Sequence, residues 1–279
     1  MNAPPTSAPP TSEASPAPLL ELEDIRLSFK AVRAVEGVGF RVRRHEVCAV
    51  IGPNGAGKSS ILNIVSGVYR PDAGSITFDG ERRPFMLPRL AAQRGIARTF
   101  QNIAVFKGMS VLENILTGTN LRVESNWIEQ LLGVGRATTA ERREREHASR
   151  VLEFLDLQRY RDAPVGRLAY GLQKRVELGR ALAAAPKLLL LDEPMAGMNA
   201  EEKSEMSSAI LDVNRQLGTT IVLIEHDMRV VMDISDHVVV LDYGRVVGDG
   251  TPDEVRRNPE VLRAYLGRRR EVARPAEVI

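Results

Sequence analysis

The chain has 279 residues, of which 43% are apolar and 27% are charged, and its net charge is +2. This is the composition of an ordinary globular protein with room for one large domain or two smaller ones. So small a net charge gives no broad basic field of the kind with which nucleic-acid-binding proteins follow phosphates. A single cysteine, Cys48, excludes an internal disulfide and fits a buried position in a protein of a reducing compartment.

The apolar runs are too short to cross a membrane. The longest, such as Leu188–Leu191 and Val238–Leu241, have the length of a strand, whereas a spanning helix needs about 20 apolar residues. If the protein works at a membrane, other chains supply the spans. Residues 1–18 are rich in Pro, Ala, Ser and Thr and lack the features of a secretory signal, so we expect a disordered tail. Residues 268–279 are predicted as a second tail.

Local patterns in the N-terminal third predict strands and one helix. Alternating apolar residues between Leu20 and Leu27 predict a half-exposed strand. Val47–Ile51 is a short buried strand that runs into a glycine-rich turn, and a helix is expected from Lys58. Ile76–Phe78 precedes Asp79-Gly80, a residue pair typical of a hairpin turn.

Buried strands separated by helical patterns dominate the C-terminal half: Leu188–Leu191, Ile221–Ile224 and Val238–Leu241. This alternation predicts an α/β fold, with a mainly parallel sheet, helices on both faces and a smaller antiparallel part near the N-terminus.

Helix starts carry their own signals. Three pairs place a cap and a carboxylate where the first free amides need acceptors: Ser110 with Glu113, Asn199 with Glu202, and Thr251 with Glu254. Between Ser110 and Leu157 the pattern is helical, less regular near 125–139, and without a strand. We expect a helical insert in the α/β frame.

Gly52–Ser59, with the sequence GPNGAGKS, has the features of a phosphate-binding loop. It follows a predicted strand and opens a predicted helix, which is the setting that such a loop requires. Its glycines let the backbone wrap around phosphates, and its amides and the helix N-terminus attract anions. Lys58 would reach the β- and γ-phosphates and Ser59 would ligate Mg²⁺. The alternative is a glycine turn with an incidental lysine.

Asp192 and Glu193 end the strand KLLLLDE. A bare carboxylate there is costly without a cation, and Mg²⁺ would resolve this for Asp192. Glu193, one residue further, is suited to orient and deprotonate an attacking water. Alternatively, the pair could cap the next helix. His226 follows Ile221–Ile224 at a strand end of the same kind, where α/β sheets collect ligand contacts, although a lone histidine is more often structural.

Together the motifs resemble one family. In chain order they are GPNGAGKS (52–59), RTFQ (98–101), LAYGLQKR (168–175), LLLLDEP (188–194), AGMN (196–199) and IEHD (224–227). Their order and spacing are similar to those of the nucleotide-binding domains of ATP-binding-cassette (ABC) transporters. The resemblance covers about residues 19–267 and implies a P-loop ATPase fold with a helical subdomain near 100–172, in which ATP and Mg²⁺ are bound and ATP hydrolysis drives transport.

The resemblance also implies roles for single residues. Gln101 is similar to the loop glutamine that senses Mg²⁺ and the lytic water, and His226 to the switch histidine at the γ-phosphate. Phe29 is similar to the aromatic that stacks on adenine, although an ordinary core phenylalanine is the alternative. The implied nucleotide-binding set is Phe29, Gly52, Pro53, Asn54, Gly55, Ala56, Gly57, Lys58, Ser59, Ser60, Asp192, Ala169 and Gly171. The implied metal set is Ser59, Gln101 and Asp192, and the implied catalytic set is Glu193, His226 and Gln101.

Two positions depart from the family pattern. In the signature loop, which is commonly LSGGQ, Ala169 lacks the hydroxyl that would donate to the γ-phosphate, a hydrogen bond worth about 1.5–3 kcal/mol. The amides around Gly171 and the N-terminus of its helix remain available. Asn199 stands where the family usually has Asp, which bears on coupling between two sites.

Within the family, the motifs look most like those of bacterial branched-chain amino-acid importers, and the ending NPEVLRAYLG (258–267) belongs to this likeness. Urea-type importers and lipopolysaccharide exporters have similar ATPases. The implied location is peripheral, at the cytoplasmic face of the inner membrane. The implied partners are transmembrane permease subunits, a second identical or different ATPase subunit and, indirectly, a solute-binding protein, with no nucleic acid.

The sequence disfavours two rival functions. A soluble cassette ATPase of DNA repair or translation would, by family resemblance, carry a long coiled-coil insertion or two cassettes, whereas this chain has one cassette and no sustained heptads. A P-loop kinase would have no reason to carry a signature loop or a switch histidine. The sequence does not reveal the transported solute, because no residue of this chain need touch it.

Overall fold

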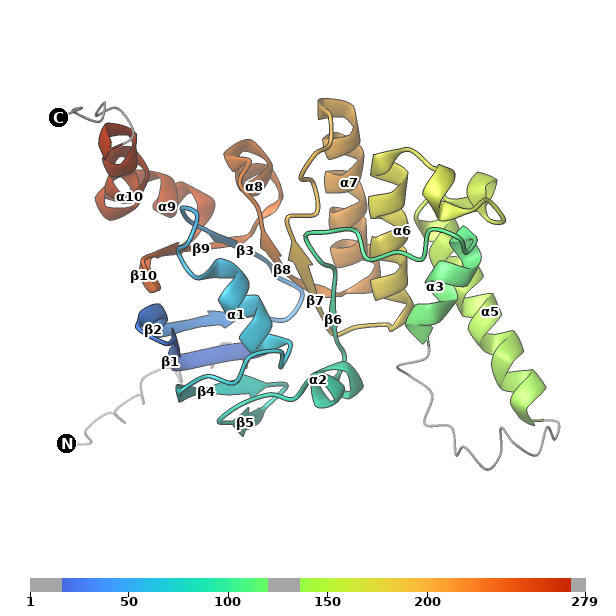
Figure 1. Ribbon diagram of the computed structural model, residues 1–279, viewed down its shortest axis with the longest axis horizontal. Coiled ribbons are helices and arrows are strands. Elements are labelled where there is room, and N and C mark those ends of the chain that lie inside the picture. The colour runs from blue at the N-terminus through green and yellow to red at the C-terminus, as the bar shows by residue number, and fades with distance from the viewer. Residues whose placement is uncertain (1–16, 120–135, 272–279) are drawn as a thin grey trace, which may run out of the picture.

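The computed structural model describes residues 17–119 and 136–271 (Figure 1). The predicted N-terminal tail lies outside this part of the chain except for its last two residues, and so does everything after Glu271. The described residues form two sheets and a series of helices.

A four-stranded antiparallel sheet forms from β1 (Leu20–Phe29), β2 (Val32–Val42), β4 (Ala73–Phe78) and β5 (Glu81–Arg83), in the order β2-β1-β4-β5. The predicted strand is confirmed as β1, and its alternation breaks between Leu22 and Ile25, where the pairing with β2 shifts register. The predicted hairpin is β4–β5. Asp79 and Gly80 both have positive φ, 52° and 81°, as a tight two-residue hairpin turn requires.

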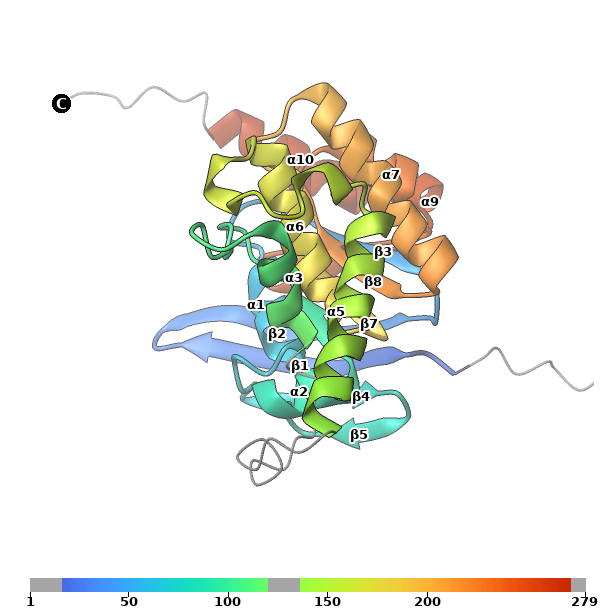
Figure 2. The same cartoon turned by 90° about the vertical axis from the view of Figure 1, so that its right-hand side faces the viewer.

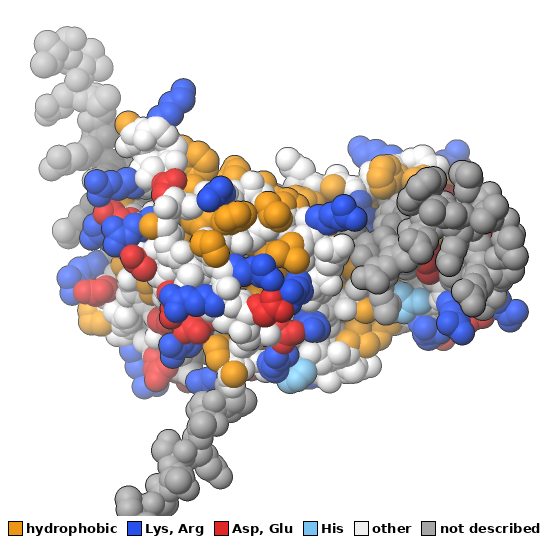
Figure 3. Space-filling model, turned by 90° about the horizontal axis from the view of Figure 1, so that it is seen from below, with side chains coloured by type: hydrophobic (Ala, Val, Ile, Leu, Met, Phe, Trp, Pro, Cys, Tyr) orange, Lys and Arg blue, Asp and Glu red, His pale blue; other side chains and the backbone are white. Residues whose placement is uncertain are grey.

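Charges of both signs lie on this side of the molecule. Arg82 of β5 pairs with Glu23 of β1 at 2.5 Å, and within β5 Arg83 pairs with Glu81 at 2.6 Å. Figure 3 views the molecule from the side of β4, β5 and α2 (Pro88–Arg94), and shows basic and acidic side chains interspersed. This face therefore presents no field of a single sign.

The second sheet has six strands in the order β10-β9-β3-β8-β7-β6. They are β3 (Val47–Ile51), β6 (Ile96–Arg98), β7 (Leu188–Asp192), β8 (Thr220–Ile224), β9 (His237–Asp242) and β10 (Arg245–Gly250). All neighbours are parallel except β9 and β10. Every residue of β3, β7 and β8 is buried, which is why they are continuous apolar runs in the sequence. The three-residue strand β6 was not predicted.

Consecutive side chains of the central strands enter two different cores, because a strand alternates its side chains between the two faces of a sheet. Val47, Ala49 and Ile51 of β3 join one cluster with apolar residues of the helices α3 (Val111–Thr119), α5 (Arg136–Phe154), α6 (Tyr170–Ala183) and α7 (Ala200–Leu217). Cys48 and Val50 join the other with α1 (Lys58–Val65) and the antiparallel sheet. The buried position predicted for Cys48 is confirmed.

The remaining helices are α3 (Val111–Thr119), α5 (Arg136–Phe154), α6 (Tyr170–Ala183), α7 (Ala200–Leu217), α8 (Met228–Ile234), α9 (Pro252–Arg257) and α10 (Pro259–Glu271), with 3-10 turns at Gln158–Tyr160 and Val165–Arg167. The three predicted helix starts are confirmed. Asn199 with Glu202 and Thr251 with Glu254 form complete capping boxes, and Ser110 Oγ accepts from the Glu113 N–H at 3.2 Å.

The helical insert gathers at one end of the molecule. Figure 2 shows α3 and α5 side by side in front of the six-stranded sheet, and their apolar residues share a cluster with α6. Residues 125–135 of the predicted irregular stretch lie outside the described chain, and 136–139 already belong to α5. At the other end, α10 continues to Glu271, four residues into the stretch 268–279 that was predicted as a tail.

Candidate active site

The loop 52–57 follows β3 and closes around the side chain of Lys58. Gly52 and Gly57 have φ of 146° and 100°. A Cβ on Gly52 would lie 2.1 Å from the Leu241 carbonyl oxygen, and one on Gly57 would lie 2.5 Å from that of Ala34, so only glycine fits either position. Lys58 is 6% exposed, and its Nζ donates to the carbonyls of Gly52 at 2.8 Å and Pro53 at 3.0 Å. The ammonium is thus held inside the loop.

The helix that follows the loop is α1, which begins at Lys58 as predicted. No acidic residue lies in its first turn, and no side chain caps its N-terminus. Its first amides are therefore free of a competing carboxylate, and together with Lys58 they favour an anion at this position. Ser59, the predicted metal ligand, is exposed on the first turn.

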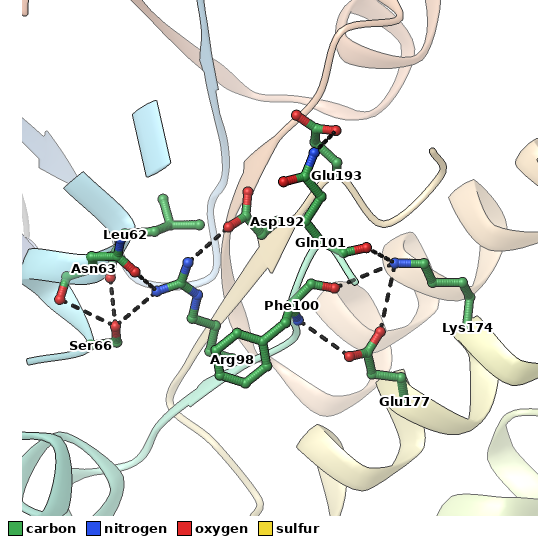
Figure 4. Close-up of polar contacts among 10 residues, drawn as sticks. All are labelled: Leu62, Asn63, Ser66, Arg98, Phe100, Gln101, Lys174, Glu177, Asp192 and Glu193. Atoms are coloured by element: carbon green, nitrogen blue, oxygen red, sulfur yellow. Dashed lines mark hydrogen bonds and ion pairs between the residues drawn. The ribbon is translucent and has the colours of Figure 1, made fainter. Parts of the chain in front are cut away.

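Asp192, the last residue of β7, has one carboxylate oxygen held and the other unpartnered (Figure 4). Its Oδ2 accepts a hydrogen bond from Arg98 Nη2 at 2.8 Å. Arg98 ends the neighbouring strand β6, and its Nη1 donates to Asn63 Oδ1 at 2.6 Å and Ser66 Oγ at 3.1 Å in α1. Over residues 17–119 and 136–271, Asp192 Oδ1 is buried without a hydrogen-bond partner.

The oxygen atoms of Asp192 and Ser59 fit a Mg²⁺ ion that arrives with a nucleotide. Such an ion takes one or two carboxylates, phosphate oxygens and several waters rather than a cage of protein ligands. The free oxygen of Asp192 and the hydroxyl of Ser59 have this chemistry. The described residues hold no group of three or more His, Cys, Asp or Glu side chains arranged for a metal.

Glu193 meets both of the other predicted catalytic residues. Its Oε2 accepts from Gln101 Nε2 at 3.0 Å, and its Oε1 lies 2.6 Å from His226 Nε2. Glu193 has a φ of 50°, a strained conformation for a residue with a side chain, and its N–H donates to the Ile224 carbonyl at 3.0 Å. The alternative that Asp192 and Glu193 cap the next helix is wrong, because Asn199 caps α7.

Two more carboxylates shape the turn around His226. Glu225 is 4% exposed and accepts from the N–H groups of Met195 at 2.9 Å and His226 at 3.1 Å. Burial raises the pKa of Glu225, although these hydrogen bonds oppose the shift. Asp227 caps α8, and its pKa is lowered by Lys203, whose Nζ lies 2.8 Å from its Oδ2. Glu225 thereby fixes the backbone on both sides of the Glu193–His226 contact.

The signature residues stand at the start of α6, away from the phosphate loop. Ala169 is the N-cap residue, without a side-chain hydrogen bond, and Tyr170 is 42% exposed. In Figure 1 the strands β8 and β7 separate α1 from α6. A Cβ on Gly171 would lie 2.7 Å from Glu202 Oε1, so a substitution there would disturb the cap of α7 in the same chain.

Phe29 is not a core residue. It is 45% exposed at the end of β1, and its ring meets Tyr69 edge to face with centroids 5.2 Å apart. The alternative of an ordinary core phenylalanine is therefore wrong, and an aromatic face remains available for stacking.

Sequence reasoning assigned no role to Arg98, Lys174, Glu177 or Glu225, although all four lie in or beside quoted motifs. Lys174 and Glu177 lie within α6, Arg98 ends β6, and Glu225 directly follows β8. A charged residue next to apolar neighbours in or at the end of an element is the signal that could have found them. Tyr265 of α10 was also missed. Burial raises its pKa to about 12, while a hydrogen bond with the backbone of Gly52 acts in the opposite direction. Helix α10 thus reaches the phosphate loop.

Comparisons with known proteins identify the family of the chain. A sequence model of the ABC transporter family matches residues 35–196, and one described as branched-chain amino acid ATP-binding cassette transporter matches residues 245–271. The high-affinity branched-chain amino acid transport ATP-binding protein BraF of Pseudomonas aeruginosa is 39% identical over 250 residues, which are 90% of this chain and 98% of BraF. The corresponding LivG of Escherichia coli is 36% identical with the same coverage.

Other relatives extend the comparison. The lipopolysaccharide export system ATP-binding protein LptB of Haemophilus influenzae is 33% identical over 250 residues, 89% of this chain and 97% of LptB. Among solved structures, a nucleotide-free ATP-binding cassette from an ABC transporter has a TM-score of 0.78 at 31% identity, and covers 89% of this chain and 99% of its own. The ADP conformation of such a cassette has a TM-score of 0.78 at 32% identity, with 90% and 99% covered.

The likeness to these cassettes confirms the predicted fold class, a P-loop ATPase core with a parallel sheet, an antiparallel sheet and added helices. The family model covers more than half of the chain, and the relatives match over nearly their whole length. The chain therefore belongs to the ABC transporter family, as an ATP-binding subunit that hydrolyses ATP.

Proposed function

We propose that this chain hydrolyses MgATP at the carboxyl edge of its six-stranded sheet to energise an importer of branched-chain or other hydrophobic amino acids. The observation that carries the hydrolytic part is the contact of Glu193 with both Gln101 and His226 at the edge that holds the phosphate loop. The transported class rests on the match of residues 245–271 and on the names of BraF and LivG.

The nucleotide would be held mainly by backbone. The N–H groups of the loop and of the start of α1 (Gly52 and residues 54–60), together with Lys58, would bind the phosphates. Pro53 lies in this loop but has no N–H to donate. The exposed ring of Phe29 would stack on the adenine. Asp192, Ser59 and Gln101 would hold Mg²⁺. When bound, this ion neutralises charge that develops on the phosphates.

Glu193 is the residue proposed to act on water. Its two oxygens are oriented by Gln101 and His226, and 15% of its side chain is exposed. A carboxylate fixed in this way can align a water and take its proton, a contribution of roughly 10²–10⁴-fold to the rate. The N–H and imidazole contacts around His226 would keep that ring next to the γ-phosphate.

Membrane subunits are the first proposed partners, and the chain would be peripheral, at the cytoplasmic face of the inner membrane. Within the described ranges, no helix combines the length and apolarity needed to span a bilayer. The loop around Gln101 exposes Phe100 by 44% and Phe106 by 53%, and exposed aromatics beside a helical insert suit the docking of a helix from another subunit. A solute-binding protein would act through those subunits.

A second cassette, identical or different, is the other proposed partner. The start of α6, with Ala169 and Gly171, has no acidic residue in its first turn, and it stands apart from α1 in Figure 1. Two anion-seeking helix starts on one chain suit two different nucleotides. To test this, the mass of the Glu193→Gln chain is measured by light scattering with MgATP. We expect a dimer that the additional Lys58→Ala change abolishes, and a persistent monomer that has bound ATP would contradict the homodimer.

The test of the whole proposal is transport in a defined system. The chain is purified with the membrane subunits that accompany it, reconstituted in vesicles with ATP, and assayed with radiolabelled leucine. We expect leucine uptake that the Glu193→Gln chain does not support. Stimulation of ATP hydrolysis by a urea-type solute or by lipopolysaccharide, with none by leucine, would instead assign the chain to one of those systems.

A further inference from the structure

A buried ion pair in α6 faces the loop that carries Gln101. Lys174 and Glu177 lie one helical turn apart, with Lys174 Nζ 3.7 Å from Glu177 Oε2. Their side chains are only 2% and 1% exposed. Charges buried this deeply are costly unless several hydrogen bonds satisfy them, so their partners show what the pair does.

Those partners are the backbone on both sides of Gln101 (Figure 4). Glu177 Oε1 accepts from the N–H of Phe100 at 3.3 Å and from the N–H of Ala104 at 3.2 Å. Lys174 Nζ donates to the carbonyl of Gln101 at 3.0 Å and to that of Phe100 at 3.4 Å. The loop is thus clamped to α6 before, at and after Gln101.

The same helix begins with the signature residues. Ala169 is the N-cap of α6, and Lys174 and Glu177 are on its first two turns. A helix is stiff over this length, since each residue is hydrogen-bonded to the turn before it. A displacement of the signature end would therefore reach Gln101, whose Nε2 donates to Glu193 Oε2 at 3.0 Å.

We propose that Lys174 and Glu177 are positioning residues for ATP hydrolysis, which couple the signature end of α6 to Gln101. Neither touches the reacting atoms. They hold the Gln101 backbone at the distance from which its side chain reaches Glu193. When the start of α6 moves, Gln101 of the same chain therefore moves with it. This inference rests on the role proposed above for Gln101.

Two neutral variants of the full chain test it, because neither leaves a lone buried charge. Lys174→Met with Glu177→Ala removes every contact of the clamp, whereas Lys174→Met with Glu177→Gln keeps an oxygen that can accept from the Phe100 and Ala104 N–H groups. Because small misplacements in an active site slow turnover, we expect kcat for ATP to fall about 10–100-fold in the Ala variant, KM to stay nearly constant, and the Gln variant to recover part of kcat.

The decisive measurement combines the Ala variant with Gln101→Ala. If the clamp acts through Gln101, the combined chain is no slower than Gln101→Ala alone, because effects on one unit are not additive. Hydrogen exchange at Phe100 and Ala104 should be faster in the Ala variant than in the Gln variant. The control is Glu205→Gln. Glu205 is an exposed residue of α7 that pairs with Arg175 of α6, and its substitution should leave kcat unchanged.

Losses that multiply in the combined chain would overturn the inference, and so would an Ala variant with normal kcat beside a slow Gln101→Ala chain. A Gln101→Ala chain with normal kcat would overturn the proposed role of Gln101 itself, and the inference with it. Melting temperature and nucleotide affinity are measured in both neutral variants as controls. If both quantities are equal, a difference in kcat arises from the position of Gln101 and not from folding.

Discussion

Arg98 donates a hydrogen bond from Nη2 to Asp192 Oδ2 at 2.8 Å, although the two residues are 94 positions apart in the chain. Their side chains are 9% and 6% exposed. A buried carboxylate is costly to keep ionised without a partner, so Arg98 neutralises the acid that we propose as a Mg²⁺ ligand, and fixes which of its oxygens stays free.

Replacing Arg98 with Met should therefore destabilise the nucleotide-free chain. Removing one member of a buried ion pair costs about 3–5 kcal/mol, and we expect a loss of that order in the free energy of unfolding by urea. Added Mg²⁺ and nucleotide should recover part of it, because they bind only the folded state and bring a cation to Asp192. The control Arg94→Met breaks an exposed ion pair with Glu81 and should cost far less. A similar loss in both variants, insensitive to Mg²⁺, would contradict this interpretation.

The Glu193→Gln chain should bind MgATP normally but hydrolyse it slowly. The substitution keeps the size and most of the hydrogen bonding to Gln101 and His226 but removes the base, so we expect phosphate release to fall roughly 10²-fold or more. Phosphate release and titration with a fluorescent nucleotide measure the two effects separately. Glu205→Gln, at an exposed carboxylate of α7, is the matched control. Near-normal release from a folded Glu193→Gln chain would exclude Glu193 from this role.

The free energy of unfolding should depend on pH through His237, at the start of β9. His237 Nε2 lies 2.5 Å from Asp249 Oδ1, and Nδ1 lies 3.6 Å from Glu46 Oε1. Burial and the charge of Arg43 lower the pKa of His237, but the Asp249 hydrogen bond and the two acidic charges outweigh them, and the pKa is raised. Protonation of His237 therefore stabilises the folded state.

This stabilisation is complete below the unfolded pKa of about 6.5 and is lost as pH rises through the folded value. Urea unfolding at several pH values between about 6 and 9 should show a fall in stability that His237→Gln lacks. His45→Gln, which keeps the His237 cluster, should retain the fall. An unchanged pH dependence in His237→Gln would show that other groups produce it.

Asn199 should cap its helix about as effectively as the Asp that the family usually has at this position. Its side chain accepts from the Glu202 N–H at 2.9 Å, and Asn and Asp are nearly equal at this position of a helix. Asn199→Ala should cost about 1 kcal/mol of unfolding free energy, whereas Asn199→Asp should change it little. A change in ATP hydrolysis by Asn199→Asp at constant stability would then report on coupling rather than on folding, and a large stability change would contradict the equivalence.

The phosphate loop could be predicted from the sequence because all of its determinants are local. A buried strand, three glycines and a helix follow one another without a gap, and the backbone of Gly52 and Gly57 excludes any other residue. The capping boxes of α7 and α9 were equally readable, since cap and carboxylate are three residues apart. The buried strands β3, β7 and β8 are visible as apolar runs, because both of their faces are covered.

Other features depended on strand order, which local patterns do not carry. The three-residue strand β6 is too short for a periodic signal, yet it places Arg98 beside Asp192. The 2.6 Å contact of His226 with Glu193 arises because β8 is the neighbour of β7. Lys174 and Glu177 differ from an ordinary surface pair of α6 only through burial.

The motifs and their local geometry were therefore determined by the sequence itself, through turn chemistry, helix capping and the burial of apolar runs. The connections among the motifs were decided only by the tertiary structure. Parallel strands bring residues far apart in the chain to one edge, and the hydrogen bonds that orient Asp192, Glu193 and Gln101 exist only after that edge has formed.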